Sequence, residues 1–329
     1  MTESELIRWI RNQKQEQPPF VLKGVGDDCA VFDPGLQSRL VVSTDVLVEG
    51  VHFRRRWMHP YFLGRKSLLV NLSDLAAMGA MPSACLLTLT LPPDLTGGFF
   101  RSYMEGFLEE ARRWKAPLVG GDLSRGSCVH AGVTIWGHLE TGDPVYRSTA
   151  NEGDAVVLVG DVGLSAAGLN LLKREDPTEL AAIRTEEDLA AWAGDSFRWR
   201  CLKAHFLPTP QIQAGDWLRR HGFASAMIDV SDGLRIDLQR LSGDSGLCFE
   251  AGSRIPLEPG LTAHISKEAA LTGGEDYALL AAISGERLER LRTVYPPHLP
   301  GWRRIGTLRQ PDADGGAEED SSNGFDHFA

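Results

Sequence analysis

Apolar positions recur along the chain with two different spacings, which together predict a mixture of strands and helices. Alternating or β-branched runs predict strands at residues 40–44, 85–91, 129–136 and 155–159. Runs with apolar residues every three or four positions predict helices at residues 64–78, 99–114, 164–173, 212–221 and 286–294. The pattern therefore predicts a mixed α/β (α+β) fold.

A turn-rich segment near the middle of the chain suggests a division into two domains. Thr141-Gly-Asp-Pro144 is a cluster of turn residues, and residues 150–153 have the character of a short connection. We therefore expect an N-terminal domain of residues 1–149 and a C-terminal α+β domain of residues 150–329.

Two segments of the second half have an unusual composition. Residues 174–200 are highly charged and helical in pattern, so we expect an insertion on the surface. Residues 312–323 are acidic, rich in Gly and Ser, and lack an apolar period, which predicts a flexible tether.

Composition narrows the class of protein. The 329 residues carry a formal charge of −10, which argues against nucleic acid as a partner, since nucleic-acid binders present a basic face. The five cysteines are an odd number and widely spread, so neither a disulfide framework nor a zinc site fits, and a cytoplasmic location is expected. The most apolar stretch, residues 67–91, is interrupted by Asp74, Gly79 and Pro82, which predicts no membrane span.

Acidic residues follow several of the apolar segments. Five such motifs are present: Gly26-Asp-Asp28, Ser43-Thr-Asp45, Gly120-Gly-Asp122, Asp229-Val-Ser-Asp232 and Gly273-Gly-Glu-Asp276. Ligands bind at the carboxyl ends of strands in α/β proteins, and carboxylate oxygens suit Mg²⁺ that also contacts substrate phosphates. A single motif is explained equally well as a turn or a helix cap, where Asp and Gly are favoured. Five in one chain favour a magnesium and phosphate site.

The predicted helix at residues 64–78 carries the most specific signal. It is apolar on almost every face, which predicts burial, and Asn71 and Asp74 lie three residues apart on one face. A buried carboxylate must be neutralised, either by a structural ion pair with Arg or Lys or by a metal ion. The chain has no G-x-x-x-x-G-K-[ST] loop and no protein-kinase motif set, so aspartates replace the phosphate-binding lysine loop.

In their order, these motifs resemble those of the thiamine-monophosphate kinase family. That family belongs to a superfamily with aminoimidazole ribonucleotide synthetase and selenophosphate synthetase. The resemblance runs through Asn71-Leu-Ser-Asp-Leu-Ala-Ala-Met-Gly-Ala80 and ends on Gly324-Phe-Asp-His-Phe328. It spans residues from about 20 to the C-terminus and also includes the five acidic motifs.

The resemblance implies a set of site residues. Those that would hold several Mg²⁺ ions are Asp28, Ser43, Thr44, Asp45, Asp74, Asp122, Asp229 and Asp232. Those that would contact ATP are Tyr103, Gly121, Asp122, Arg147 and Ser231. Those that would contact thiamine monophosphate are His52, Glu275 and Phe325. Asp74, Asp122 and Arg147 are the expected catalytic residues.

The resemblance also implies an activity and an assembly. The activity is phosphorylation of thiamine monophosphate by ATP to give thiamine diphosphate, and the assembly is a homodimer formed through the N-terminal sheet. The acceptor is already ionised near neutral pH, because the second pKa of a phosphate monoester is about 6, so direct in-line transfer requires no general base. Two alternatives stay open: a sister ATP-dependent synthetase of the aminoimidazole ribonucleotide or selenophosphate type, and a catalytically silent thiamine-diphosphate binder.

Overall fold

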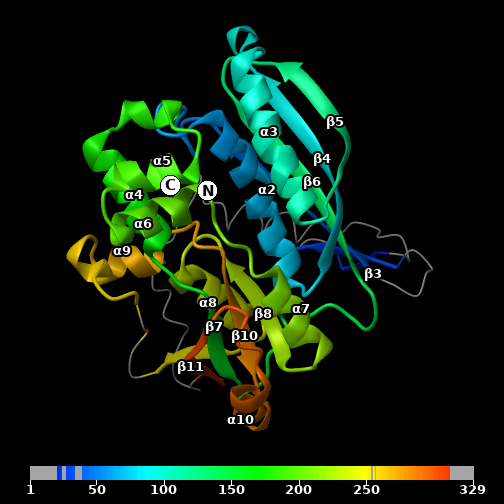
Figure 1. The fold of residues 1–329 in the computed structure, drawn as a ribbon. Helices are drawn as coiled ribbons and strands as arrows, with labels where there is room; N and C mark the ends of the chain where they lie inside the picture. The colour runs from blue at the N-terminus through cyan, green and yellow to red at the C-terminus, as the bar shows by residue number, and fades with distance from the viewer. Residues whose placement is uncertain (1–20, 24–26, 34–38, 253–254, 256, 312–329) are drawn as a thin grey trace.

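The computed structural model describes residues 21–23, 27–33, 39–252, 255 and 257–311. The predicted tether and Phe325 therefore lie outside the described residues. Two sheets organise the remainder of the chain, one built before residue 140 and the other after residue 154 (Figure 1).

The first sheet has six strands in the order β1-β2-β3-β6-β4-β5. Their bounds are β1 (Val21–Lys23), β2 (Ala30–Phe32), β3 (Arg39–Val48), β4 (Met81–Leu91), β5 (Leu118–Arg125) and β6 (His130–Leu139). Neighbours are antiparallel except β4 and β5, which run parallel. The two helices between the strands, α2 (Pro60–Ala77) and α3 (Gly98–Arg113), lie together on one side of the sheet (Figure 1).

Helices α2 and α3 cross at unusually close range. A Cβ atom at Gly64 would lie 1.9 Å from the Tyr103 carbonyl oxygen, and one at Gly106 would lie 2.0 Å from the Tyr61 carbonyl oxygen. Only glycine at both positions allows this approach. As a result α2 is buried on nearly every face, as predicted, and its polar residues must find partners within the protein.

The second sheet has five antiparallel strands in the order β8-β10-β7-β11-β9. Their bounds are β7 (Ala155–Val159), β8 (Ala224–Val230), β9 (Cys248–Ala251), β10 (Ala278–Ile283) and β11 (Trp302–Arg309). Helix α8 (Leu234–Asp244) shares an apolar core with one face, and α7 (Ile212–Arg220) and α10 (Gly285–Val294) share one with the other. Both faces of this sheet are therefore covered.

A group of helices from the second half packs beside α2 (Figure 1). It comprises α4 (Leu164–Glu175), α5 (Glu186–Ala193) and α6 (Ser196–Phe206), while α9 (Lys267–Thr272) packs against α4. The short 3₁₀ turns are Pro93–Leu95, Thr178–Ala182 and Leu261–Ala263.

The segment at residues 174–200 is helical and largely exposed, as expected, but a few of its apolar residues anchor it to the core. Leu180, Leu189 and Ala193 are at most 3% exposed and belong to the same apolar core as α2. Arg65 of α2 also forms an ion pair with Glu186, with a separation of 2.8 Å. The charges of this segment masked a few well-spaced apolar residues that attach it to the first half.

The predicted fold class is confirmed, and each predicted strand and helix is present with bounds that differ by a few residues. The two sheets separate around the expected boundary at residue 150. The apolar core does not separate there, because residues such as Leu172, Phe206 and Tyr277 join the core of the first half. No helix among the described residues is long and apolar enough to cross a membrane.

Candidate active site

Three carboxylates from distant parts of the chain meet where the two halves join. Asp28 lies just before β2, Asp74 lies on α2, and Asp229 lies on β8; each offers an oxygen within 4.8 Å of the others. We call these three residues the carboxylate cluster. Since α2 is fixed between the two sheets, its burial brings together motifs that are 155 residues apart in sequence.

Among the described residues, the positive charge near the carboxylate cluster does not offset the effects of burial and mutual repulsion. Burial, followed by the neighbouring carboxylates of Asp45 and Asp229, raises the pKa of Asp74 well above its usual range, against the effect of a hydrogen bond from Ser43. Burial and Asp229 likewise raise the pKa of Asp28, with Arg147 opposing. Burial also raises the pKa of Asp229 to about 6. The three groups are thus held close together at a cost in charge repulsion.

The donor set of the carboxylate cluster fits a hard divalent cation. Its side chains are all carboxylates, and one oxygen each of Asp28 and Asp229 is buried without a hydrogen-bond partner in the described part of the chain. Such orphaned buried oxygens are rare unless a ligand, water or ion satisfies them. Carboxylate oxygens are also the protein ligands that Mg²⁺ takes.

Strand β3 and helix α2 hold the next residues against the cluster. The Ser43 hydroxyl donates to Asp74, and the amide oxygen of Asn71 accepts from the Asp45 backbone N–H at 3.0 Å. Asp45 lies two residues beyond Ser43 on the strand, so both side chains share the sheet face that α2 covers. Asn71 and Asp74 thus both contact β3, in agreement with their expected placement on one face of the helix.

Helix α8 supports the loop after β8. Asp237 accepts hydrogen bonds from the backbone N–H groups of Ser231 and Asp232, both at 3.1 Å, and Arg240 donates to the Asp232 carboxylate at 2.5 Å. Arg147 lies 2.7 Å from Asp244 and 3.8 Å from Asp28. Asp232, Ser231 and Arg147 therefore lie beside the cluster.

Sequence reasoning missed the α8 residues Asp237, Arg240 and Asp244. Arg240 and Asp244 lie three and seven residues after Asp237, which places all three on one face of the helix that follows the Asp229-Val-Ser-Asp232 motif. That spacing is the signal that could have found them.

Several predicted residues lie apart from the cluster within this chain. The Thr44 hydroxyl donates to the Val133 carbonyl oxygen, and strand alternation turns it to the sheet face opposite Ser43. Asp122 is exposed on β5 in register with Thr88, three strand spacings or roughly 14 Å from β3. Gly121 lies beside Asp122 on the same edge strand.

Tyr103 does not fit its expected role as an ATP contact. Its side chain is 0% exposed on α3, and its hydroxyl lies 2.7 Å from the Ser67 hydroxyl of α2. It belongs to the interface between the two helices. A nucleotide could reach this side chain only if the helices moved apart.

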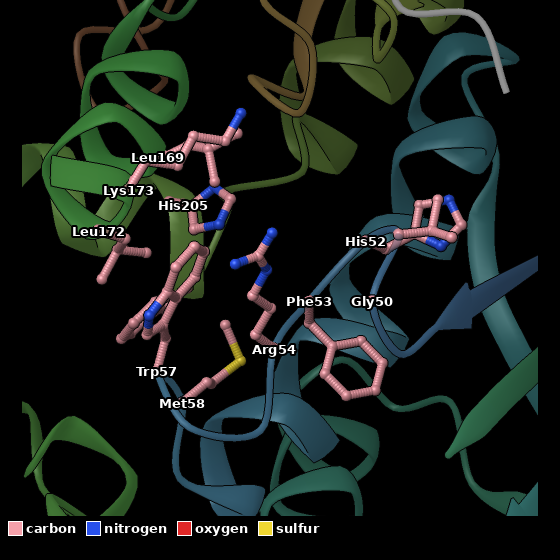
Figure 2. Close-up of a pocket in the computed structure, with 12 residues that line it drawn as sticks. Gly50, His52, Phe53, Arg54, Trp57, Met58, Leu169, Leu172, Lys173 and His205 are labelled. Atoms are coloured by element: carbon pink, nitrogen blue, oxygen red, sulfur yellow. The ribbon is translucent and has the colours of Figure 1, made fainter. Parts of the chain in front are cut away.

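Of the two described residues expected to contact thiamine monophosphate, one lines a cavity and the other lies behind a residue that lines it. His52 lines a cavity of about 250 Å³ together with Phe53, Trp57 and Met58 from the loop before α2 (Figure 2). Leu172, Lys173, His205 and Phe206 from α4 and α6 form the opposite wall. We call this cavity the aromatic pocket. Glu275 reaches its edge, since its carboxylate lies 3.4 Å from the ring of His205.

Known proteins are similar to this chain in both sequence and fold. The thiamine-monophosphate kinase of Buchnera aphidicola (subsp. Acyrthosiphon pisum) is 33% identical over 312 residues, covering 93% of this chain and 91% of the relative. The chain belongs to the thiamine-monophosphate kinase family. The family member from Bacillus subtilis is 34% identical over 292 residues, 87% of this chain and 85% of its own.

Two further comparisons agree with this membership. Residues 26–139 match the family model described as AIR synthase related protein, N-terminal domain. The solved structure of AaThiL complexed with AMPPCP and TMP has a TM-score of 0.80 and 29% identity, covering 99% of this chain and 97% of that one. The thiamine-monophosphate kinase resemblance seen in the motifs is confirmed.

Proposed function

We propose that this protein transfers the γ-phosphoryl group of ATP to thiamine monophosphate and forms thiamine diphosphate. Membership of the thiamine-monophosphate kinase family supports the phosphotransferase activity. The single observation in the structure that carries the proposal is the carboxylate cluster, with Asp28, Asp74 and Asp229 within 4.8 Å of one another beside Arg147.

The cluster would hold Mg²⁺, with Asp45, Asp232 and Ser43 as neighbouring ligands. Bound there, Mg²⁺ would neutralise and align the phosphate groups of donor and acceptor. Arg147 is positioned by Asp244 to contact phosphate oxygens. Asp237 and Arg240 orient the loop that carries Ser231 and Asp232.

The transfer is direct, without a phosphorylated protein. The acceptor phosphate needs no base, because its second pKa is about 6. The protein's tasks are therefore to position the reactants and exclude water, which account for most of phosphoryl-transfer catalysis. A protein phosphorylated by radiolabelled ATP in the absence of acceptor would contradict this.

The aromatic pocket would take the thiamine rings. Trp57, Phe53 and Phe206 are at most 5% exposed and give it flat apolar walls. Lys66 pairs with Glu275, which lies beside the pocket residue His205. On α2, Lys66 lies eight residues before Asp74, which is about 12 Å along a helix. That separation suits a substrate with a ring at one end and a phosphate at the other.

The chain would act as a homodimer formed through its first sheet. Unlike the second sheet, this one has its helices on one face only, and Val46, Val119 and Leu123 are 48–65% exposed on β3 and β5. Every residue of β5 from Val119 onward is exposed, and an uncovered edge strand invites pairing with another chain.

In such a dimer Asp122 would act on the partner's cluster. A mixture of Asp74→Asn and Asp122→Asn proteins would then regain about a quarter of wild-type activity, because half the dimers are mixed and each has one intact site. No regain would place Asp122 in its own chain's site. Five free cysteines fit a reducing, cytoplasmic location.

The direct test is to incubate purified protein with ATP, Mg²⁺ and thiamine monophosphate and to quantify thiamine diphosphate by chromatography. The proposal predicts product that requires all three components and disappears with Asp74→Asn. Absence of product from wild-type protein that binds ATP and Mg²⁺ would overturn it.

A further inference from the structure

A buried chain of polar groups connects helix α2 to the aromatic pocket. The Lys66 ammonium is 0% exposed and lies 2.7 Å from one carboxylate oxygen of Glu275. The other oxygen lies 3.4 Å from Nδ1 of His205, which lines the pocket and is 3% exposed. Three elements thus contribute one side chain each: α2, the loop before β10, and α6.

The loop that carries Glu275 is held in an unusual conformation. Glu275 and Tyr277 have φ angles of +68° and +52°, a backbone region that residues other than glycine rarely adopt. The Glu275 N–H donates to the Ser231 carbonyl at 2.7 Å, and the Tyr277 N–H donates to the Val230 carbonyl at 2.8 Å. Such strain persists only where surrounding contacts enforce it, and here it directs Glu275 toward Lys66 and His205.

The same loop fixes the start of α4. Asp276 accepts hydrogen bonds from the backbone N–H groups of Gly163 at 2.7 Å and Ser165 at 3.2 Å. The Ser165 hydroxyl lies 3.1 Å from Nδ1 of His205. Glu275 of the loop and Ser165 of α4 therefore both contact the His205 ring, and both contacts are made at Nδ1.

The contacts determine which ring nitrogen carries the proton. Burial, aided by the charge of Lys66, lowers the pKa of His205 to about 3, so the ring is neutral. Burial opposes ionisation of Glu275, but the charge of Lys66 outweighs burial and the pKa of Glu275 is lowered. The Ser165 hydroxyl can donate or accept at Nδ1, but an ionised carboxylate can only accept. The Glu275 carboxylate therefore favours the proton on Nδ1, with Nε2 left as an acceptor.

Two of the other polar side chains of the pocket are donors. Arg54 and Lys173 cannot accept hydrogen bonds. His52 accepts from the Val48 N–H through Nδ1 at 2.9 Å, so this nitrogen is already engaged within the protein. Nε2 of His205 is therefore the side-chain acceptor that this wall of the pocket offers to a ligand (Figure 2).

We propose that Lys66 and Glu275 are positioning residues that hold His205 as an Nε2 acceptor, and that His205 selects an acceptor substrate whose aromatic ring carries an amino group. The inference rests on the proposed function, because the pyrimidine ring of thiamine bears such a group. Under this proposal Glu275 influences substrate choice by holding the His205 ring.

The test compares thiamine monophosphate with an analogue in which hydrogen replaces the pyrimidine amino group. Wild-type kcat/KM is expected to be roughly 10- to 100-fold lower for the analogue, since a site built to bond an amino group penalises its loss. His205→Ala and Glu275→Gln should reduce this preference to about threefold or less, with the KM for ATP unchanged within about twofold. His205→Gln, which keeps an acceptor oxygen, should retain part of it.

Lys66→Met should weaken the preference and Lys66→Arg should preserve most of it. His221→Ala is the matched control, because this histidine is exposed at the end of α7 and should leave the preference intact. Full preference in His205→Ala, or equal losses for both substrates in every variant, would overturn the proposal and indicate a structural role.

A second measurement needs no variant to be active. ¹⁵N NMR of histidine-labelled wild-type protein should show a neutral His205 protonated on Nδ1, and a ring protonated on Nε2 would overturn the assignment. Wild-type protein that phosphorylates neither compound would count against the proposed function. Wild-type protein that phosphorylates both equally well would count against the selection by His205 alone.

Discussion

The carboxylate cluster and the aromatic pocket lie along the same helix, α2, yet they treat charge in opposite ways. At the Asp74 end, three carboxylates crowd together and two of their oxygens lack partners in the described chain. At the Lys66 end, the buried ammonium lies 2.7 Å from the Glu275 carboxylate, whose other oxygen lies 3.4 Å from the His205 ring. The first arrangement gathers like charges, whereas the second pairs a buried cation with a buried anion. We infer that one end serves reactivity and the other specificity.

The largest effect is expected at the cluster. Asp74→Asn should lower kcat by roughly 10³-fold, because a ligand of the phosphate-aligning cation is lost. Its free energy of unfolding in metal-free buffer should not fall, since one of three repelling carboxylates is removed. Steady-state kinetics and urea denaturation with EDTA measure both.

Asp216→Asn provides the contrasting variant. Asp216 is paired with Arg219 at 3.1 Å on α7, away from the cluster. Its loss should lower the free energy of unfolding by up to about 1 kcal/mol and leave kcat within about twofold. If Asp74→Asn were destabilised as Asp216→Asn is, the cluster would be structural and the contrast with the pocket would fail.

The next effect is on stability at the other end of α2. Lys66→Met leaves Glu275 without its buried counter-ion and should lower the free energy of unfolding by about 3 kcal/mol. Adding Glu275→Gln should restore most of the loss, as a double-mutant cycle would show. Additive losses would mean that the two groups do not form a coupled pair.

A smaller effect is expected in the pocket walls. Trp57→Leu should raise the KM for thiamine monophosphate roughly tenfold and leave the KM for ATP unchanged, because a flat aromatic face is lost. Trp57→Phe keeps a ring but loses the indole hydrogen bond to Asp176, so a rise of roughly threefold is expected. Equal rises for both substrates would argue against ring binding at this wall.

The smallest effect is expected at Tyr103, where it distinguishes a packing role in the core from contact with ATP. Tyr103→Phe removes the hydroxyl that contacts Ser67 and should cost about 1 kcal/mol of unfolding free energy. The KM for ATP should stay within about twofold, since Tyr103 is buried between α2 and α3. A large rise in that KM with little loss of stability would restore Tyr103 as an ATP contact.

The positions of the carboxylate cluster could be predicted from the sequence better than those of the aromatic pocket. Asp74 and Asn71 were accessible because helix periodicity alone places them on one buried face. His205 and Lys173 were not, because they reach the pocket through packing of α4 and α6 beside α2. That packing depends on Leu180 and Leu189, whose burial was hidden by the surrounding charges. The position of Asp122 was not predictable either, since its distance from Asp74 depends on the order of the strands in the first sheet.

If the carboxylate cluster holds a divalent cation, it should bind Mn²⁺, and a Mn²⁺ titration measures this binding without relying on turnover. Mn²⁺ takes the same oxygen ligands as Mg²⁺, and the EPR signal of the free ion reports how much is bound. Wild-type protein should bind Mn²⁺ in competition with Mg²⁺, and Asp74→Asn and Asp229→Asn should each weaken binding by roughly 10- to 100-fold. Equal binding by wild type and both variants would contradict the account.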